Sequence, residues 1–222
     1  MEIGVLITVY NEGSKIDKVL KKLTKYRVIV VNDGSTDNTL SEVEKYKNVE
    51  IITYSKNKGK GYALRRGFAW ARKLKFDILV LMDGDGQHNP SDIPRFIKKI
   101  DDGFDVVLGS RFIKHTKIPF FRRILLHGGR LIEKLVIGID LTDVHNGYRA
   151  INKRALTKLK LSENRMAYAS ELMMGIVKHD LSYSEIPIKV KYTREIMDHG
   201  TSSVFTGFKI LFRLALLKIR RF

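Results

Sequence analysis

Short apolar runs alternate with longer amphipathic segments through the first half of the chain, and this alternation restricts the folds open to it. The apolar runs span residues 3–9, 28–31, 49–54, 77–82 and 105–109. The segments between them, residues 14–26, 36–46, 61–74 and 91–102, place apolar side chains at helical spacing. Strand and helix in regular succession predict βαβ units. We therefore expect an α/β fold in which a mostly parallel sheet with right-handed crossovers carries helices on both faces.

The length and composition fit one domain of this class. A chain of 222 residues with 44% hydrophobic content can bury a sizeable core. It has no cysteine, which excludes disulfides and thiolate metal sites. The first residues lack the order of a signal peptide, and no apolar run approaches the roughly 18 residues of a spanning helix. These features favour an intracellular protein that does not cross a bilayer by itself.

The chain is strongly basic, with 41 Lys and Arg against 24 Asp and Glu, a net charge of +17. Such a charge predicts an anionic partner, which is a nucleic acid, a phosphorylated small molecule or a membrane surface. The charge alone does not choose among the three.

The loops that follow the predicted strands carry the polar motifs, and in a parallel sheet these loops meet at one edge. Their sequences are TVYNEGS (8–14), NDGSTDNT (32–39), SKNKGKG (55–61) and DGDGQH (83–88). NDGSTDNT by itself also fits a simple turn, in which Ser35 or Thr36 caps the next helix.

The two aspartates of DGDGQH are harder to explain by turn chemistry. Carboxylates at i and i+2 of a strand end point the same way and repel each other unless a cation lies between them. Gly84 and Gly86 are expected to clear the approach of a ligand. Mg²⁺ or Mn²⁺ prefers oxygen ligands and often bridges carboxylates to substrate phosphates. We therefore predict a metal site at Asp83 and Asp85, to which Gln87 adds an oxygen.

Six motifs in order, TVYNE, VNDGSTD, NKGKG, DGDGQH, GSRF and NGYRAINKRAL, resemble those of the GT-A glycosyltransferases of family 2. Within this family the chain is most similar to the dolichyl-phosphate mannose synthase branch. The resemblance implies a single GT-A (Rossmann-like) domain over residues 1–203. It also implies inverting transfer of a sugar from a nucleotide sugar, with GDP-mannose favoured, to a polyprenyl (dolichyl) phosphate. Relatives with the same motifs use UDP-glucose or UDP-N-acetylglucosamine, with lipid-phosphate or glycan acceptors, so these remain alternatives.

The resemblance also assigns residues to the donor and the metal. The nucleotide-sugar site would comprise Thr8, Tyr10, Glu12, Val31, Asp33, Asp83, Gly84, Asp85, Arg111, Arg194 and Ser203. The metal, Mg²⁺ or Mn²⁺, would be held by Asp83, Asp85 and Gln87. The sequence departs from the family pattern at Thr8, where proline is common. It departs again before Gly200, where the gap is longer and Ser203 replaces an expected lysine.

On the acceptor side the matching residues are Arg111, Arg122, Asn146 and Arg149, and the catalytic set is Asp85, Arg111 and Asp143. A serine expected near Arg122 is Leu126 here. A phosphate acceptor is already an anion, so catalysis needs positioning and charge stabilisation more than a strong base. Asp143 is either a general base or, as we favour, a support held near Arg149. Glu171 is expected only to stabilise the first turn of its own helix.

Two basic segments suggest contact with a membrane. Residues 117–139 combine aromatic and basic side chains, which fits helices in a membrane interface or a core-facing pair with a solvated basic side. Residues 204–222 predict a basic amphipathic helix that buries its apolar side in lipid or in a partner protein. The expected location is peripheral, at an anionic membrane surface on the cytoplasmic face of the cell membrane.

Two other classes fit less well. A nucleic-acid-binding protein would explain the charge but gives no reason for paired carboxylates, so we expect no nucleic-acid partner. A sugar nucleotidyltransferase would share the nucleotide and metal chemistry. Such enzymes normally have a glycine-rich, basic loop after the first strand, whereas this chain has Tyr10, Asn11 and Glu12.

Overall fold

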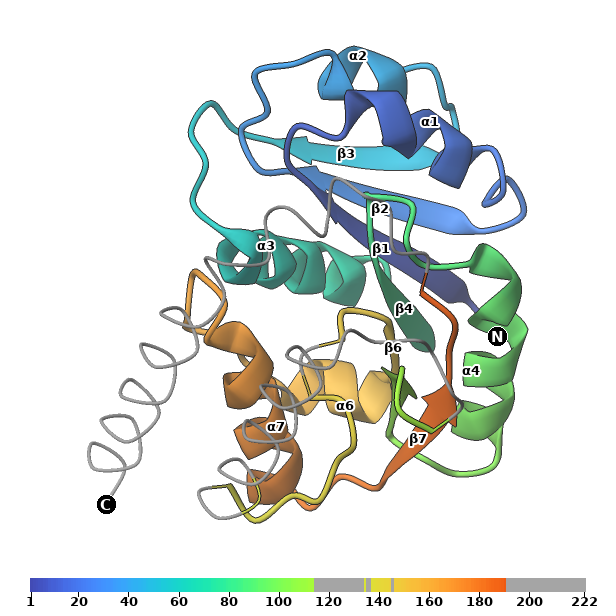
Figure 1. Cartoon of the computed structure of the whole chain (residues 1–222), viewed down its shortest axis with the longest axis vertical. Helices are drawn as coiled ribbons and strands as arrows, with labels where there is room; N and C mark the ends of the chain where they lie inside the picture. Colours follow the sequence, from blue (N-terminus) through green and yellow to red (C-terminus); the bar gives the residue numbers. More distant parts are fainter. Residues whose placement is uncertain (114–133, 135–136, 145, 191–222) are drawn as a thin grey trace.

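The computed structural model describes residues 1–113, 134, 137–144 and 146–190. They form one seven-stranded sheet with the order β3-β2-β1-β4-β6-β5-β7. Figure 1 shows this sheet with β3 at the top and β7 at the bottom. The strands are β1 (Ile3–Val9), β2 (Arg27–Asn32), β3 (Val49–Thr53), β4 (Ile78–Asp83), β5 (Val106–Ser110), β6 (Arg149–Asn152) and β7 (Tyr183–Pro187). The helices are α1 (Gly13–Leu20), α2 (Thr39–Val43), α3 (Lys60–Lys73), the 3-10 helix η1 (Pro90–Asp92), α4 (Ile93–Asp101), α6 (Lys153–Lys158) and α7 (Tyr168–Lys178).

The sheet is parallel except for β6, which confirms the mostly parallel arrangement. β6 pairs antiparallel with β4 and with β5, while β5 and β7 pair in parallel. Because β6 runs in the opposite direction, its first residue, Arg149, lies at the edge where the other strands end. There it is opposite Leu81 of β4 and Leu108 of β5. The antiparallel strand thus brings the NGYR motif beside DGDGQH.

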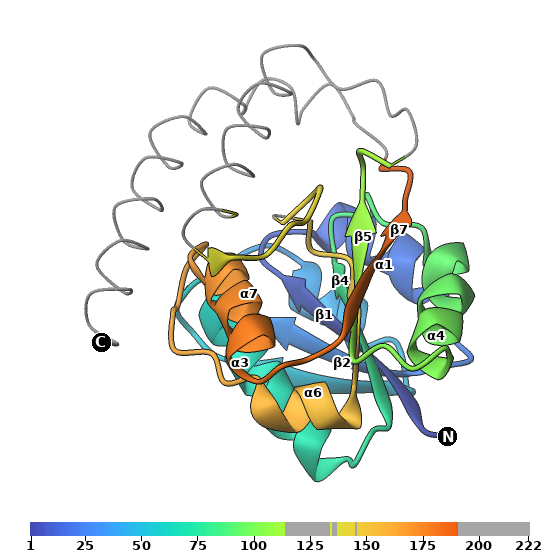
Figure 2. The ribbon, with the colours of Figure 1, turned by 90° about the horizontal axis from the view of Figure 1, so that it is seen from below.

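Each face of the sheet has its own apolar core, as the alternation of side chains along a strand requires. Leu6 of β1 belongs to the core shared with α3, α6 and α7. Its neighbours Val5 and Ile7 belong to the core shared with α1, α2 and α4. Figure 2 shows α3, α6 and α7 on one side of the sheet and α4 on the other. The prediction of helices on both faces is confirmed.

Two of the predicted helices are shorter than expected. The first was expected over residues 14–26, but α1 ends at Leu20 and the following turns close through bonds such as Leu23 N–H to the Leu20 carbonyl. The second was expected over residues 36–46, but α2 covers only Thr39–Val43. Its expected first turn is held in a loop instead, where Thr36 N–H donates to Asn11 Oδ1.

The two segments predicted to contact a membrane, residues 117–139 and 204–222, lie almost wholly outside the described residues. Within the described part, no helix has the length and apolar character needed to cross a bilayer. Ile139 and Leu141 are both buried in the core on the α3 side of the sheet. Both membrane segments stay predictions, as does the domain boundary at residue 203.

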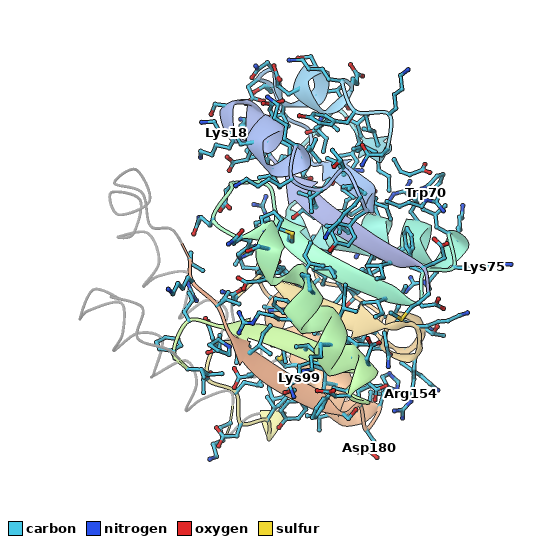
Figure 3. All side chains as sticks on the ribbon, turned by 90° about the vertical axis from the view of Figure 1, so that its right-hand side faces the viewer. Lys18, Trp70, Lys75, Lys99, Arg154 and Asp180 are labelled. Carbon is cyan, nitrogen blue, oxygen red and sulfur yellow. The ribbon has the colours of Figure 1, made fainter. Side chains whose placement is uncertain are left out.

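Asp105 holds together three segments at the edge of the sheet opposite the polar loops. Its carboxylate accepts hydrogen bonds from Asn152 Nδ2 (2.8 Å), Arg154 Nη1 (2.6 Å) and Ser182 N–H (2.9 Å). Arg154 also lies beside Asp180 at this edge (Figure 3). Burial opposes the charge of Asp105, but these donors outweigh burial and lower the pKa of the carboxyl.

We expect Asp105→Asn to lower the free energy of unfolding by about 2 kcal/mol near neutral pH, because donors to a charged acceptor lose their partner. Because the pKa of Asp105 is lower in the folded state, the variant should show its whole loss of stability well above pH 3.8, the ordinary pKa of an aspartate. It should shrink as the pH falls from there toward the folded-state pKa. Urea unfolding at several pH values measures this. Asp102→Asn is the control, since Asp102 forms an exposed pair with Lys99 and should cost less than about 1 kcal/mol. A deficit that does not narrow in acid would contradict the prediction.

Candidate active site

The loops after β1 and β2 are joined by hydrogen bonds into one unit. Asn11 has a left-handed backbone (φ 55°), which asparagine tolerates, and its N–H donates to Ser35 Oγ at 2.9 Å. Glu12 N–H donates to Thr39 Oγ1 at 2.8 Å. Tyr10 is 47% exposed, so its ring is available to a ligand. The interlocked loops therefore present the Tyr10 ring at the carboxyl edge of the sheet.

Glu12 and Thr8 connect this unit to the DGDGQH turn. Burial raises the pKa of Glu12, and the nearby Asp85 carboxylate raises it further. Lys15, whose Nζ lies 3.0 Å from Glu12 Oε2, acts in the opposite direction. Thr8 is buried and lies opposite Asp83 in the β1–β4 register. The structure thus brings together Thr8, Tyr10, Glu12, Asp83 and Asp85, as the sequence predicts.

Asp33 is buried, and it binds the loop that follows β3. Its carboxylate accepts from Tyr54 Oη (2.7 Å) and from the N–H groups of Lys58 (2.9 Å) and Gly59 (2.8 Å). Both oxygens are therefore bound to protein donors that sequence reasoning did not anticipate. Val31, also assigned to the nucleotide, has its side chain fully buried in the core. The nucleotide roles of Asp33 and Val31 stay predictions.

Asp83 is the last residue of β4, and it forms an ion pair with Lys60, the first residue of α3. Burial opposes the charge of Asp83, but the surrounding positive charge, that of Lys60 first, outweighs burial, so the pKa of the Asp83 carboxyl lies below its usual value. For Lys60, burial lowers the pKa of the ammonium, but the negative charge of Asp83 and its other neighbours outweigh burial, so this pKa is raised. Sequence reasoning missed Lys60. The signal available was a lysine in SKNKGKG, a loop expected at the same edge as the aspartates.

Asp85 is bound by its own turn. Its oxygens accept from the Gln87 N–H (2.9 Å) and from Gln87 Nε2 (2.5 Å). Asp83, Asp85 and Gln87 offer only hard oxygen ligands for a metal, which suit Mg²⁺ or Mn²⁺. Across the described ranges, no group of three or more His, Cys, Asp or Glu side chains could hold a metal ion. The donor set fits a divalent ion that completes its coordination with substrate phosphates, and metal binding stays a prediction.

The structure explains the glycines at and beside this turn by packing and backbone conformation. A Cβ on Gly84 would collide with the side chain of Val9, so the residue is small because the turn packs on β1. Gly86 has φ +75°, a conformation that glycine adopts without strain. A Cβ on Gly147 would lie 2.6 Å from Asp83 Oδ2, so the NGYR segment passes directly against this carboxylate. The expectation that Gly84 clears a ligand's approach is therefore corrected.

Arg111 and Asp143 form a bidentate ion pair at the end of β5. Arg111 Nε donates to Asp143 Oδ2 at 2.6 Å, Nη2 donates to Oδ1 at 2.7 Å, and the Arg111 N–H adds a third bond at 3.0 Å. The Asp143 side chain is only 1% exposed. Glu185 of β7 fixes the same loop by accepting from the Thr142 N–H at 3.0 Å. Asp143 is thus held by Arg111, a pairing that the sequence did not predict, while Arg149 lies near this loop and donates to the carbonyl of the next residue, Val144.

Arg149 instead shapes the turn before β6. It is 1% exposed, and it donates from Nε to the Asn146 carbonyl (2.9 Å) and from Nη2 to the Val144 carbonyl (2.7 Å). Asn146 is also buried and accepts from the Tyr148 N–H at 2.8 Å. Asn146 and Arg149, two of the four predicted acceptor residues, therefore lie beneath the edge, where they fix the chain that passes Asp83.

His88 links this segment to the DGDGQH turn. Its Nδ1 accepts from the Asp83 N–H at 3.2 Å, and its ring stacks on Tyr148 with centroids 4.8 Å apart. Burial lowers the pKa of His88, which favours the neutral ring that this hydrogen bond requires. Tyr148 Oη donates to the Asn89 carbonyl at 2.9 Å. The two motifs are thus packed into one rigid unit.

Glu171 of α7 does more than stabilise its own helix, and that expectation is corrected. Its carboxylate accepts from the N–H groups of Ser162 (2.9 Å) and Glu163 (3.0 Å). This segment packs on the start of α3, where the Tyr62 N–H donates to the Asn164 carbonyl at 3.0 Å. Glu171 therefore supports the helix end that carries Lys60. The only signal in the sequence was one acidic residue among the apolar residues of YASELMMGIVKH.

Three of the predicted site residues, Arg122, Arg194 and Ser203, lie outside the described residues.

Comparisons with known proteins agree with this geometry. The family model described as Glycosyl transferase family 2 matches residues 4–160. The UDP-N-acetylglucosamine--dolichyl-phosphate N-acetylglucosaminyltransferase of Methanococcus voltae is 37% identical, over 98% of this chain and 96% of that protein. The dolichol-phosphate mannosyltransferase of Pyrococcus furiosus is 29% identical, over 96% of this chain and 64% of that protein.

A solved mycobacterial protein shares the fold, with a TM-score of 0.68 at 19% identity, over 90% of this chain and 70% of that one. The mixed α/β domain is structurally similar to GT-A glycosyltransferases, which confirms the predicted fold class. The family match covers β1 to α6, and so it includes most of the carboxyl edge described above. The chain is a transferase and belongs to glycosyl transferase family 2.

Proposed function

We propose that this protein transfers a sugar from a nucleotide sugar to a polyprenyl phosphate. One observation carries the proposal: the Asp83–Asp85 turn and the Arg111–Asp143 pair lie at the same edge of the sheet. The first offers oxygen ligands for a cation that binds a diphosphate, and the second offers a fixed guanidinium suited to phosphate. The relatives from M. voltae and P. furiosus are both named for dolichyl-phosphate chemistry, which supports the acceptor class.

The chemistry follows from the charge of the acceptor. A phosphate oxygen attacks the anomeric carbon in line, forms the new C–O bond and displaces the nucleoside diphosphate, which inverts the configuration. Because this oxygen is already an anion near neutral pH, no strong base is needed. Arg111, held in one orientation by Asp143, offsets the repulsion between the two phosphorylated groups. A divalent metal held by Asp83, Asp85 and Gln87 would neutralise charge on the leaving diphosphate.

Two donors are supported by different relatives. The relative from P. furiosus is named for mannosyl transfer, which agrees with the GDP-mannose that the motifs favour, while the relative from M. voltae is named for UDP-N-acetylglucosamine. Both donors contain the same diphosphate and differ in base and sugar. The exposed Tyr10 ring is the described group best placed to stack on the base of either donor.

The proposed location is peripheral, on the cytoplasmic face of the membrane. A lipid-phosphate acceptor requires access to the bilayer surface, and the net charge of +17 suits anionic lipid. Residues 117–139 and 204–222 are the segments proposed for this contact. The alternative for residues 204–222 is that a helix predicted there binds a membrane protein.

A thermal-shift panel identifies the donor. We expect GDP-mannose or UDP-N-acetylglucosamine, together with Mn²⁺, to raise Tm by about 5–10 °C at roughly 100 times its Kd. UDP-glucose and each nucleotide sugar without Mn²⁺ are the comparisons. If no nucleotide sugar shifts Tm, the donor assignment is wrong.

A further inference from the structure

One carboxylate of the predicted metal site, Asp83, already has a cation beside it. Lys60 contacts Asp83 Oδ1, and the two side chains are only 26% and 25% exposed. The charge of Arg149, a second cation, also acts on this pair. Asp83 therefore faces positive charge before any ligand binds.

A divalent ion that binds here alone meets an unfavourable environment. It would lie close to the Lys60 ammonium in a partly enclosed site, where like charges repel more than in water. Asp85 is the one other acidic group of the predicted metal set, and the described residues contain no cluster of three ligands that would compensate. A nucleoside diphosphate changes this balance, because its negative charges attract both the metal ion and the ammonium.

Of the two cations, Lys60 is the one that can move. Arg149 is 1% exposed and its guanidinium is held by two backbone carbonyls. The Lys60 ammonium is partly exposed at the end of a flexible side chain, with Asp83 as its carboxylate partner.

We propose that Lys60 is a resident cation that occupies Asp83 when no substrate is bound and moves to the diphosphate when metal and nucleotide bind together. Lys60 thereby makes the two ligands depend on each other, and it disfavours a metal-loaded site without donor. The inference rests on the proposed function, because it concerns the diphosphate site of that reaction. By linkage, the metal must tighten the nucleotide by the same factor as the nucleotide tightens the metal.

The test measures binding to the full chain and requires no acceptor. Isothermal titration gives the Kd of Mn²⁺ alone, of GDP or UDP alone, and of each in the presence of the other. For Lys60→Met we expect Mn²⁺ alone to bind about tenfold more tightly and the nucleoside diphosphate about tenfold more weakly. The factor by which each ligand tightens the other should fall by a similar amount, within the roughly 5- to 150-fold range of coupled sites.

Lys58→Met is the matched control. It removes the same charge from the same loop, but Lys58 Nζ lies over the Tyr62 ring, 4.7 Å from its centroid. Its Mn²⁺ affinity should equal that of the wild type. Lys60→Arg keeps the positive charge and should keep the weak Mn²⁺ binding. Lys60→Gln replaces Lys60→Met if the methionine variant does not fold.

The proposal is overturned if removing the Lys60 charge leaves the affinity for Mn²⁺ alone unchanged, or changes it no more than Lys58→Met does. It is also overturned if neither the wild type nor the variant binds Mn²⁺. Failure of the proposed function would look different. In that case Lys60→Met would still alter metal and nucleotide binding, but no sugar would reach a polyprenyl phosphate.

Discussion

Asp85→Asn should reduce sugar transfer by about a hundredfold or more while the fold is retained. The asparagine keeps the shape of Asp85 and can still accept from the Gln87 N–H, but it removes one of two negative charges from the predicted metal site. Loss of metal stabilisation raises a barrier by several kcal/mol, and about 3 kcal/mol corresponds to roughly two orders of magnitude in rate. Initial rates over a series of Mn²⁺ concentrations measure the effect.

Asp92→Asn serves as the control for this substitution. Asp92 pairs with Arg95 in the segment that follows the turn, at 2.7 Å, and its loss should leave transfer nearly unchanged. Near-normal transfer by Asp85→Asn, or a wild type indifferent to a chelator, would show that the metal reading of Asp83 and Asp85 is wrong.

The second large effect concerns Asp143, which should act through Arg111. Asp143→Ala leaves a mostly buried guanidinium without its carboxylate, which costs about 3–5 kcal/mol of stability. Transfer should fall to the level of Arg111→Ala, because Arg111 loses its fixed orientation. The double variant should then be no slower than Arg111→Ala alone, since coupled residues give non-additive effects. Rates per folded molecule, with folding checked by circular dichroism, measure this.

A general base would behave differently. If Asp143 takes a proton from the acceptor independently of Arg111, the two effects multiply in the double variant. Asp143→Ala would then change the pH–rate profile in a way that Arg111→Ala does not. Either result would show that Asp143 is a general base and does not act by positioning Arg111.

The first half of the fold follows from the sequence because four of its five strands, β1, β2, β4 and β5, are buried on both faces. Continuous apolar runs such as residues 3–9 leave little choice, and the five predicted strands agree with β1 to β5 within about one residue. β6 was missed because its four residues begin with Arg149, a charged side chain at a buried position. β7 contains Glu185 and Pro187, so its local pattern does not indicate a strand. Contacts with distant segments, not local preference, place both strands in the sheet.

The site shows the same division. Its location at the carboxyl edge follows from the strand–helix alternation, but its ion pairs do not. Arg111 and Asp143 are 32 residues apart, and Lys60 and Asp83 are 23 apart, so only the folded sheet brings them together. We expected Asp143 to be held near Arg149, but its ion-pair partner is Arg111, because Arg149 binds the carbonyls of its own turn. The identity of this partner depends on the folded sheet and does not follow from the local sequence.

Transfer of label into lipid tests the central claim most directly. The purified full chain is mixed with Mn²⁺, a polyprenyl phosphate and either GDP-mannose or UDP-N-acetylglucosamine labelled in the sugar, and the mixture is extracted with organic solvent. We predict that label from one donor enters the organic phase as nucleoside diphosphate is released, and that polyprenol without phosphate accepts none. Release of pyrophosphate would indicate nucleotidyl transfer. Label that stays in the aqueous phase with both donors would contradict the account.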